Sequence, residues 1–187
     1  MRFIIVEGPQ GCGKTSLTNY LRDNIAGANL YRLSGQKDKT TTGKAKSTKM
    51  YFALLDYLKE IEDCDMNLIF DRTFFTEQVF GLLGYKEYDF TDIYEELLTR
   101  LGKLNYEIYY ISLYLKDTNI FETRLKREHH NYQAFSLDNS INQQNTYKSL
   151  IPGIKALPNV KVYEVAMDDF DLAYKEINKI LGIGENK

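Results

Sequence analysis

The chain has 187 residues, of which 43% are hydrophobic and 27% are charged, and these values indicate one globular domain, expected to span residues 1–187. A formal net charge of −2 argues against general nucleic-acid binding, because nucleic-acid-binding domains are usually strongly basic. Two cysteines are too few for a disulfide framework, and the longest apolar run, residues 108–115, is far shorter than the ~20 residues that span a bilayer, so we expect a cytoplasmic protein without membrane contacts.

Apolar runs alternate with segments at helical spacing along the chain. The predicted strands are residues 2–7, 29–33, 67–71, 106–115 and 159–167. The predicted helices are residues 14–26, 50–61, 73–83, 93–104, 117–130, 138–151 and 168–182. A polar run rich in Gly, Thr and Lys, residues 34–47, is predicted to be a loop. This alternation predicts an α/β domain with a five-stranded, largely parallel sheet.

A phosphate-binding motif lies between the first predicted strand and the first predicted helix. Its residues follow the pattern G-x-x-x-x-G-K-[ST] in the stretch "VEGPQGCGKTSL". Successive backbone N–H groups and the positive end of the helix favour bound phosphates, the lysine reaches the β- and γ-phosphates, and the threonine hydroxyl ligates Mg²⁺. We therefore expect ATP and Mg²⁺ to bind, and the expected nucleotide-binding residues are Gly8, Gly11, Gly13, Lys14, Thr15 and Ser16.

The third predicted strand ends in an Asp-Arg pair, Asp71 and Arg72. A carboxylate at the carboxyl end of a neighbouring strand lies beside the P-loop, where it can hold Mg²⁺ through water or orient an acceptor. The planar guanidinium of Arg72 suits a phosphate. In the alternative interpretation, Asp71 caps the following helix and Arg72 is its ion-pair partner.

The missing motifs narrow the class of nucleotide-binding protein. A switch GTPase would need a guanine-reading N-K-x-D run, which is absent, and no D-x-x-G follows the third strand. Large mechanical ATPases need a longer chain. A small P-loop kinase is the favoured class, while a polynucleotide-end kinase and a non-enzymatic nucleotide-binding switch are less favoured alternatives.

Three stretches, "VEGPQGCGKTSL", "DRTFFTEQVF" and "YYISLYLKDTNIFETRLKRE", resemble the thymidylate kinase and deoxynucleoside kinase superfamily of P-loop kinases. The resemblance covers residues 1–130 in order and the remainder weakly. It implies a P-loop nucleoside triphosphate hydrolase-like, three-layer α/β/α fold with a small helical lid at about residues 117–145. It also implies a possible homodimer, by analogy only.

The two branches of this superfamily imply different acceptors. In deoxynucleoside kinases, the residue matching Glu7 is the general base on a 5′-hydroxyl, but the acidic E-P pair of those enzymes is replaced here by "YRLSG". Thymidylate kinases carry an arginine matching Arg32, which grips the acceptor monophosphate, and a loop ending in Gly-Lys, as Gly43-Lys44 does. They usually place an acid where Gln10 stands, and their F-x-x-x-R run is absent here.

Positive charge favours the monophosphate branch. Arg32, Arg72 and the basic residues within 37–49 supply charge that a dianionic acceptor needs and a neutral nucleoside does not. We therefore expect a (deoxy)nucleoside monophosphate acceptor, with phosphorylation of a nucleoside 5′-hydroxyl as the alternative. Glu7 would be the general base for a hydroxyl acceptor, or would orient the sugar or Arg72 for a phosphate acceptor.

A basic lid helix carries Arg124 and Arg127, followed by His129 and His130. Gly11 occupies a P-loop position that some relatives fill with arginine, so the lid arginines are expected to supply the cation for the transferring phosphoryl group. A solvated basic helix face is the alternative, and the histidines are interpreted as lid-surface residues.

Together the expected catalytic residues are Glu7, Lys14, Asp71, Arg72, Arg124 and Arg127, with Thr15 and Asp71 at the metal. Aromatic side chains are candidates to stack on the acceptor base, with a core role as the alternative: Tyr51, Phe52, Phe74 and Phe75.

Overall fold

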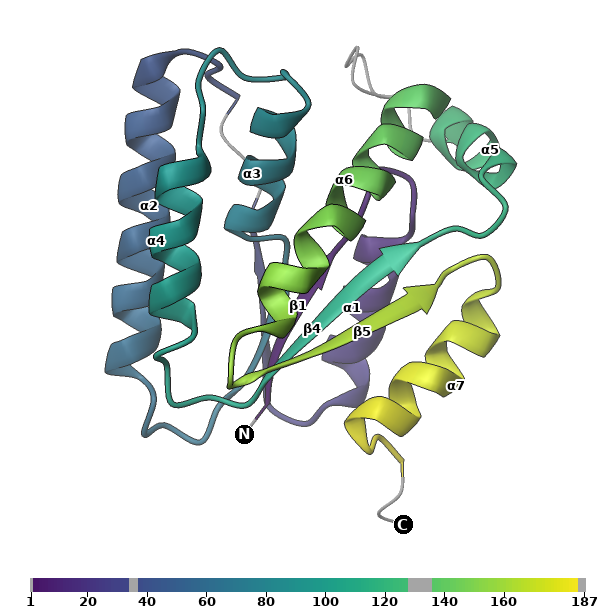
Figure 1. Cartoon of the computed structure of the whole chain (residues 1–187). Coiled ribbons are helices and arrows are strands. Elements are labelled where there is room, and N and C mark those ends of the chain that lie inside the picture. Colours follow the sequence, from purple (N-terminus) through teal and green to yellow (C-terminus); the bar gives the residue numbers. More distant parts are fainter. Residues whose placement is uncertain (1, 34–36, 128–135, 185–187) are drawn as a thin grey trace.

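The central layer is a sheet of five parallel strands, shown in the computed structural model of Figure 1. The structure describes residues 2–33, 37–127 and 136–184. The strands pair in the order β2-β3-β1-β4-β5. Their bounds are β1 Phe3–Glu7, β2 Ala28–Arg32, β3 Asn67–Asp71, β4 Ile108–Tyr114 and β5 Val160–Ala166.

Helices cover both faces of this sheet and complete a three-layer α/β/α architecture (Figure 1). The helices of the described ranges are α1 Lys14–Asn24, α2 Thr41–Glu60, α3 Phe74–Leu82, α4 Thr91–Leu101, α5 Asn119–Arg127, α6 Leu137–Lys155 and α7 Phe170–Leu181. Helices α1 and α7 pack on one face, and α2, α3, α4 and α6 pack on the other.

Side chains alternate between the two faces along each strand, as the period of a β-strand requires. In β1, Phe3 and Ile5 join the core beneath α2, α3, α4 and α6, whereas Ile4 and Val6 join the core beneath α1 and α7. All four are at most 1% exposed. Burial on both faces explains why β1, β3 and β4 are largely apolar, whereas the edge strands β2 and β5 include polar and partly exposed residues. The predicted fold class is confirmed.

Helix α2 begins within the segment that was predicted to be a loop, so that prediction is wrong for residues 41–47. The carboxylate of Asp38 accepts hydrogen bonds from the backbone N–H and the hydroxyl of Thr40, at 3.1 and 2.6 Å, and from Lys46 at 3.0 Å. A Cβ at Gly43 would lie 2.0 Å from the carbonyl oxygen of Asp38. Gly43 allows this close approach because it has no Cβ. In the sequence, the same glycine among polar residues suggests a loop, although it lies within α2.

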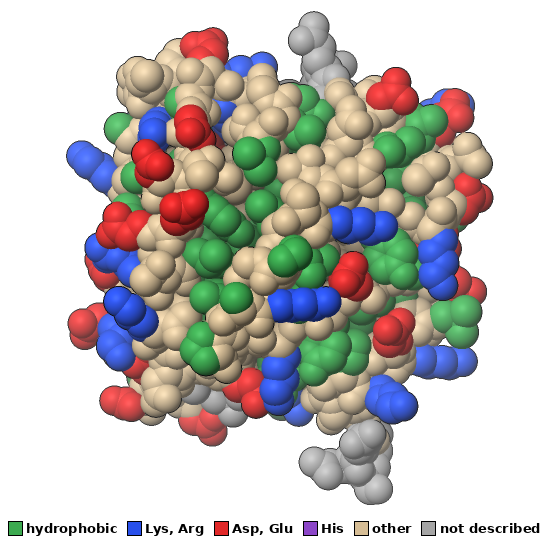
Figure 2. Space-filling view, in the orientation of Figure 1, with side chains coloured by type: hydrophobic (Ala, Val, Ile, Leu, Met, Phe, Trp, Pro, Cys, Tyr) green, Lys and Arg blue, Asp and Glu red, His purple; other side chains and the backbone are tan. Residues whose placement is uncertain are grey.

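The segment predicted to form the lid contains α5 and the start of α6. Residues 128–135, including His129 and His130, lie outside the described residues, as does the side chain of Arg127. Helix α6 continues to Lys155, beyond the predicted end at residue 151. On the face in Figure 2, acidic and basic side chains of the described residues are interspersed. None of the described helices has the length and apolar character needed to cross a membrane.

Candidate active site

Sheet topology brings the P-loop and the Asp-Arg pair together. Strands β1 and β3 are parallel neighbours, with Val6 opposite Asp71. The backbone N–H of Arg72 donates to the carbonyl oxygen of Val6 at 3.1 Å. The P-loop follows β1 and Arg72 follows β3, so both lie at the carboxyl edge of the sheet, where open α/β sheets bind ligands.

The P-loop takes a conformation that only glycine accommodates at two close approaches. Gly8 has φ +149°, and a Cβ there would lie 2.7 Å from the carbonyl oxygen of Leu113. Gly13 has φ +97°, and a Cβ there would lie 2.9 Å from a ring carbon of Phe170. The loop therefore sits directly against β4 and the start of α7, as a tight phosphate-binding turn requires.

Lys14 is folded back onto this loop and is only 4% exposed. Its ammonium group donates to the carbonyl oxygens of Gly8 and Pro9, at 2.8 and 2.6 Å. Burial lowers the pKa of Lys14 from its usual value. An anionic phosphate at the loop would favour the charged ammonium and could replace these carbonyl contacts.

Thr15 and Asp71 lie together, as the sequence predicts for a metal site. The hydroxyl of Thr15 donates to Oδ2 of Asp71 at 3.3 Å, and the hydroxyl of Thr18, one turn further along α1, donates to the same oxygen at 3.3 Å. Hydroxyl and carboxylate oxygens are the ligands that Mg²⁺ accepts alongside phosphate oxygens, so this pair fits the metal. Thr18 was missed in the sequence, although its i+3 spacing from Thr15 places it on the same helix face.

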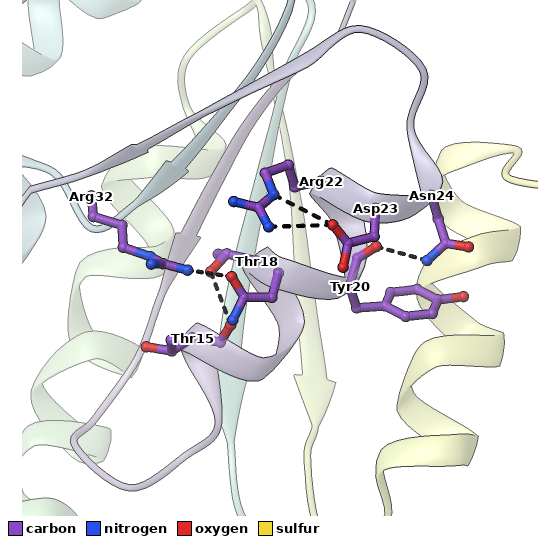
Figure 3. Close-up of polar contacts among 8 residues, drawn as sticks. Thr15, Thr18, Tyr20, Arg22, Asp23, Asn24 and Arg32 are labelled. Carbon is purple, nitrogen blue, oxygen red and sulfur yellow. Dashed lines mark hydrogen bonds and ion pairs between the residues drawn. The ribbon is translucent and has the colours of Figure 1, made fainter.

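Arg32 lies on the metal side of the site. It reaches from β2 toward α1, near Thr15 and Thr18 (Figure 3). Its Nε is 3.8 Å from Oδ2 of Asp71, and its guanidinium also donates to the side-chain oxygen of Asn19. The Arg32 side chain is 49% exposed, whereas the Asp71 side chain is only 7% exposed, so solvent reaches the guanidinium but hardly the carboxylate.

Arg72 has a left-handed backbone, with φ +72°, which no other non-glycine residue shares within the described ranges. Its guanidinium makes no hydrogen bond or ion pair with these described residues, although its charge lowers the pKa of both Glu7 and Lys14. A non-glycine residue at positive φ is strained, and such strain is common at functional sites. Arg72 is thus a half-buried cation within electrostatic reach of the P-loop.

Glu7 is completely buried, and both of its carboxylate oxygens are hydrogen-bonded. Oε1 accepts from the backbone N–H and the hydroxyl of Thr73, at 2.6 and 3.1 Å. Oε2 accepts from the hydroxyls of Thr76 and Tyr147, at 2.8 and 3.2 Å. Burial raises the pKa of Glu7 from 4.5 to about 7, against the opposing effect of these bonds and the nearby cations.

Helix α6 contributes polar contacts that sequence reasoning missed. The side-chain oxygen of Gln143 accepts from the backbone N–H of Gln10 in the P-loop at 3.0 Å. Gln144 accepts from the backbone N–H of Leu115 and donates to its carbonyl oxygen, at 2.8 and 3.1 Å. These contacts could have been anticipated from the sequence, because polar residues recur at helical spacing on the face of α6 that would ordinarily be apolar.

Three of the four aromatic candidates are core residues. Tyr51, Phe74 and Phe75 are at most 1% exposed, and the Tyr51 hydroxyl donates to the carbonyl oxygen of Thr73 at 3.3 Å. Phe52 is half-buried beneath Arg100 of α4, whose guanidinium carbon is 4.3 Å from the ring centroid. Stacking of these rings on an acceptor base stays a prediction.

Arg124 of α5 contacts the backbone of the P-loop. Its guanidinium donates to the carbonyl oxygens of Gly11 at 3.5 Å, Cys12 at 3.3 Å and Met167 at 2.6 Å. It also lies over the Phe170 ring, 4.7 Å from the centroid. In a trans peptide the carbonyl and the following N–H point in opposite directions, so Arg124 lies on the side of the loop opposite the N–H of Gly13.

Comparisons with known proteins give structural relatives only: no protein-family model and no curated protein matches the sequence. The YorR protein from Bacillus subtilis, in complex with phosphorylated GDP, has a TM-score of 0.66 at 16% identity, and the match covers 96% of this chain and 95% of the YorR chain. Thymidylate kinase from Candida albicans has a TM-score of 0.67 at 14% identity, with 97% and 91% covered. Deoxyadenosine kinase from M. mycoides with bound dATP has a TM-score of 0.60 at 16% identity, with 97% and 100% covered.

The TM-scores show a common fold, and at identities this low they show no more than that. The P-loop, the order of the strands and the position of the Asp-Arg pair agree with this fold. The chain therefore has the fold of the P-loop nucleotide and nucleoside kinases.

Proposed function

We propose that this protein transfers the γ-phosphoryl group of ATP, with Mg²⁺, to a (deoxy)nucleoside monophosphate and forms the corresponding diphosphate. The observation that carries the proposal is the guanidinium of Arg72. It is charged, half-buried and without a hydrogen-bond or ion-pair partner among the described residues, and it lies within electrostatic reach of Lys14. A planar cation in this position suits the phosphate of an acceptor better than it suits a neutral hydroxyl.

The donor side of the reaction is assigned to the P-loop. Lys14 would exchange its bonds to Gly8 and Pro9 for the phosphates of ATP, and the loop amides would hold their oxygens. Thr15 and Asp71 would hold the metal, which when bound would neutralise charge on the β- and γ-phosphates. Positioning and charge stabilisation supply most of the catalysis in this chemistry, so no side chain needs to form a covalent bond.

The surroundings of Glu7 also favour a phosphate acceptor. Its two oxygens accept four hydrogen bonds and are shielded from solvent, so no lone pair is presented to an acceptor hydroxyl. A phosphate oxygen requires no deprotonation near neutral pH. In this proposal Glu7 orients the turn at Thr73, beside Arg72, and does not act as a general base.

One observation favours the second candidate, phosphorylation of a nucleoside 5′-hydroxyl. The pKa of Glu7, about 7, is matched to proton transfer near neutral pH. Glu7 could act as the base only if a movement of α3 or α6 released one of its oxygens from Thr73, Thr76 or Tyr147.

The test is a panel of nucleosides and nucleoside monophosphates, in ribo and deoxy forms, incubated with ATP and Mg²⁺ and analysed by mass spectrometry. We expect one or more monophosphates to yield the diphosphate with an equal amount of ADP. Formation of a monophosphate from a nucleoside would establish the second candidate. Binding of ATP without transfer to any acceptor would contradict both and favour a nucleotide-binding switch.

A further inference from the structure

The first half of α6 buries polar side chains toward the site. Ser140, Gln143, Gln144 and Tyr147 recur at i, i+3, i+4 and i+7, and each is at most 6% exposed. Further along the same helix, the buried residues are apolar. Buried polar groups usually have hydrogen-bond partners. Gln143, Gln144 and Tyr147 have them, whereas the Ser140 hydroxyl has none among the described residues.

Those partners belong to separate parts of the site. Gln143 bonds to the P-loop backbone at Gln10, and one turn later Tyr147 reaches Glu7 at the end of β1. The hydroxyl of Tyr147 is 3.2 Å from Oε2 of Glu7 and 2.8 Å from the hydroxyl of Thr76 on α3. Helix α6 thus contacts both the P-loop, which is proposed to bind ATP, and the carboxylate of Glu7.

The contact continues from Glu7 to the turn that carries Arg72. Oε1 of Glu7 accepts from the backbone N–H of Thr73 at 2.6 Å, and Thr73 directly follows Arg72. The strained φ of +72° at Arg72 needs surrounding contacts to persist. Glu7 supplies such a contact on the Thr73 side, and Tyr147 and Thr76 fix the other oxygen of the same carboxylate.

We propose that Tyr147 is a positioning residue, which holds Glu7 and, through Glu7, the Arg72 turn that receives the acceptor phosphate. This inference rests on the proposed function for the role of Arg72. Tyr147 touches neither nucleotide in this account; it acts from α6 by fixing the carboxylate.

The groups around Glu7 provide a matched control. Lys14 of α1 and Arg72 are the cations that act on Glu7, and the tyrosines whose pKa it raises are Tyr51 of α2, Tyr94 of α4, Tyr110 of β4 and Tyr147 of α6. The hydroxyl of Tyr110 is buried and has no hydrogen-bond partner within residues 2–33, 37–127 and 136–184. Tyr110→Phe therefore removes a hydroxyl near Glu7 without breaking a bond among the described residues, whereas Tyr147→Phe removes the donor of the bond to Oε2 of Glu7.

The experiment compares the wild type, Tyr147→Phe and Tyr110→Phe by steady-state kinetics with the best acceptor of the panel. We expect Tyr147→Phe to raise the acceptor KM about 3- to 10-fold, the effect of losing one ordinary hydrogen bond, and to change the ATP KM less than 2-fold. Tyr110→Phe should match the wild type. Equal increases in both KM values, or identical kinetics for the two variants, would overturn the inference.

A second readout does not depend on turnover. Infrared difference spectra against Glu7→Gln identify the carboxyl band of Glu7, whose titration midpoint is followed with pH. Loss of the Tyr147 donor removes a bond to the charged form, so the midpoint should rise by about 0.5–1 pH unit in Tyr147→Phe and stay fixed in Tyr110→Phe. An unchanged midpoint in Tyr147→Phe would overturn the inference.

These readouts separate the inference from the proposed function. If the wild type phosphorylates no acceptor, the proposed function fails, and the midpoint alone decides whether Tyr147 holds Glu7. If Tyr147→Phe does not give folded protein by circular dichroism, Thr76→Val is measured in its place, because it removes the other hydroxyl that donates to Oε2 of Glu7.

Discussion

The ammonium group of Lys14 donates to the carbonyl oxygen of Pro9 at 2.6 Å, so the lysine that we propose binds phosphate is hydrogen-bonded to the loop that carries it. ATP would have to replace this bond and the bond to Gly8. Because Lys14 would stabilise charge on the transferring group, we expect Lys14→Ala to lower kcat about 10²–10³-fold while circular dichroism stays unchanged. Turnover of Lys14→Ala at the wild-type rate with saturating ATP would contradict the proposal that the protein is a kinase that uses its P-loop.

Arg124 joins α5 to the P-loop and to the end of β5, through bonds to the carbonyls of Gly11, Cys12 and Met167. We expect Arg124→Ala to raise the ATP KM and to lower Tm by roughly 3–10 °C, since a bond from a charged donor contributes ~1.5–3 kcal/mol. Arg124→Lys should restore little of either, because an ammonium cannot span the same carbonyls. A lower kcat with unchanged ATP KM and Tm would instead indicate that Arg124 acts only in the transition state.

The raised pKa of Glu7 leads us to expect that the free energy of unfolding depends on pH. Its pKa is 4.5 when unperturbed and about 7 in the folded protein, so the folded state binds more protons in this window. The contribution of Glu7 to the free energy of unfolding is therefore highest below pH 4.5 and falls as pH rises to about 7, by up to about 1.4 kcal/mol per pH unit. Urea unfolding at pH 5, 6 and 7 should show this fall in the wild type and much less of it in Glu7→Gln. Parallel pH profiles for the two proteins would contradict the raised pKa.

Arg32 is half exposed and pairs with the buried carboxylate of Asp71, with an Nε–Oδ2 distance of 3.8 Å. This distance is long, and Asp71 also accepts hydrogen bonds from Thr15 and Thr18, so the guanidinium can turn toward an acceptor phosphate without leaving the carboxylate unpaired. We expect Arg32→Ala to raise the acceptor KM roughly 10- to 150-fold and to leave the ATP KM and Tm nearly unchanged. An unchanged acceptor KM with an altered Mg²⁺ requirement would assign Arg32 to the metal side alone.

Much of the fold was readable from local patterns. The inner strands β1, β3 and β4 are apolar runs because both faces of the sheet are covered there, and the P-loop glycines follow from the backbone turn they must make. The start of α2 was misjudged because Gly43 is needed for its approach to Asp38, which lies earlier in the chain and which composition does not reveal. The periodic spacing of apolar residues does not reveal a helix start that depends on a contact of this kind.

The site was predictable where its residues lie in one motif or at one strand end, and less so elsewhere. Arg32 and Asp71 are opposite each other in the β2–β3 register, so their proximity depends on strand pairing. Tyr147 is 140 positions from Glu7, and only the packing of α6 against the sheet brings them together. A tyrosine on a helix is ordinarily a core residue, and nothing in its neighbours indicates a carboxylate partner.

In the proposed function, Arg72 receives the phosphate of a monophosphate acceptor. Calorimetric titration of the wild type and Arg72→Ala with the preferred monophosphate and with the matching nucleoside measures this contact. We expect the wild type to bind the monophosphate roughly 10- to 150-fold more tightly than the nucleoside, and Arg72→Ala to lose most of this preference. Equal affinity of the wild type for both ligands, or a preference that survives in Arg72→Ala, would contradict it.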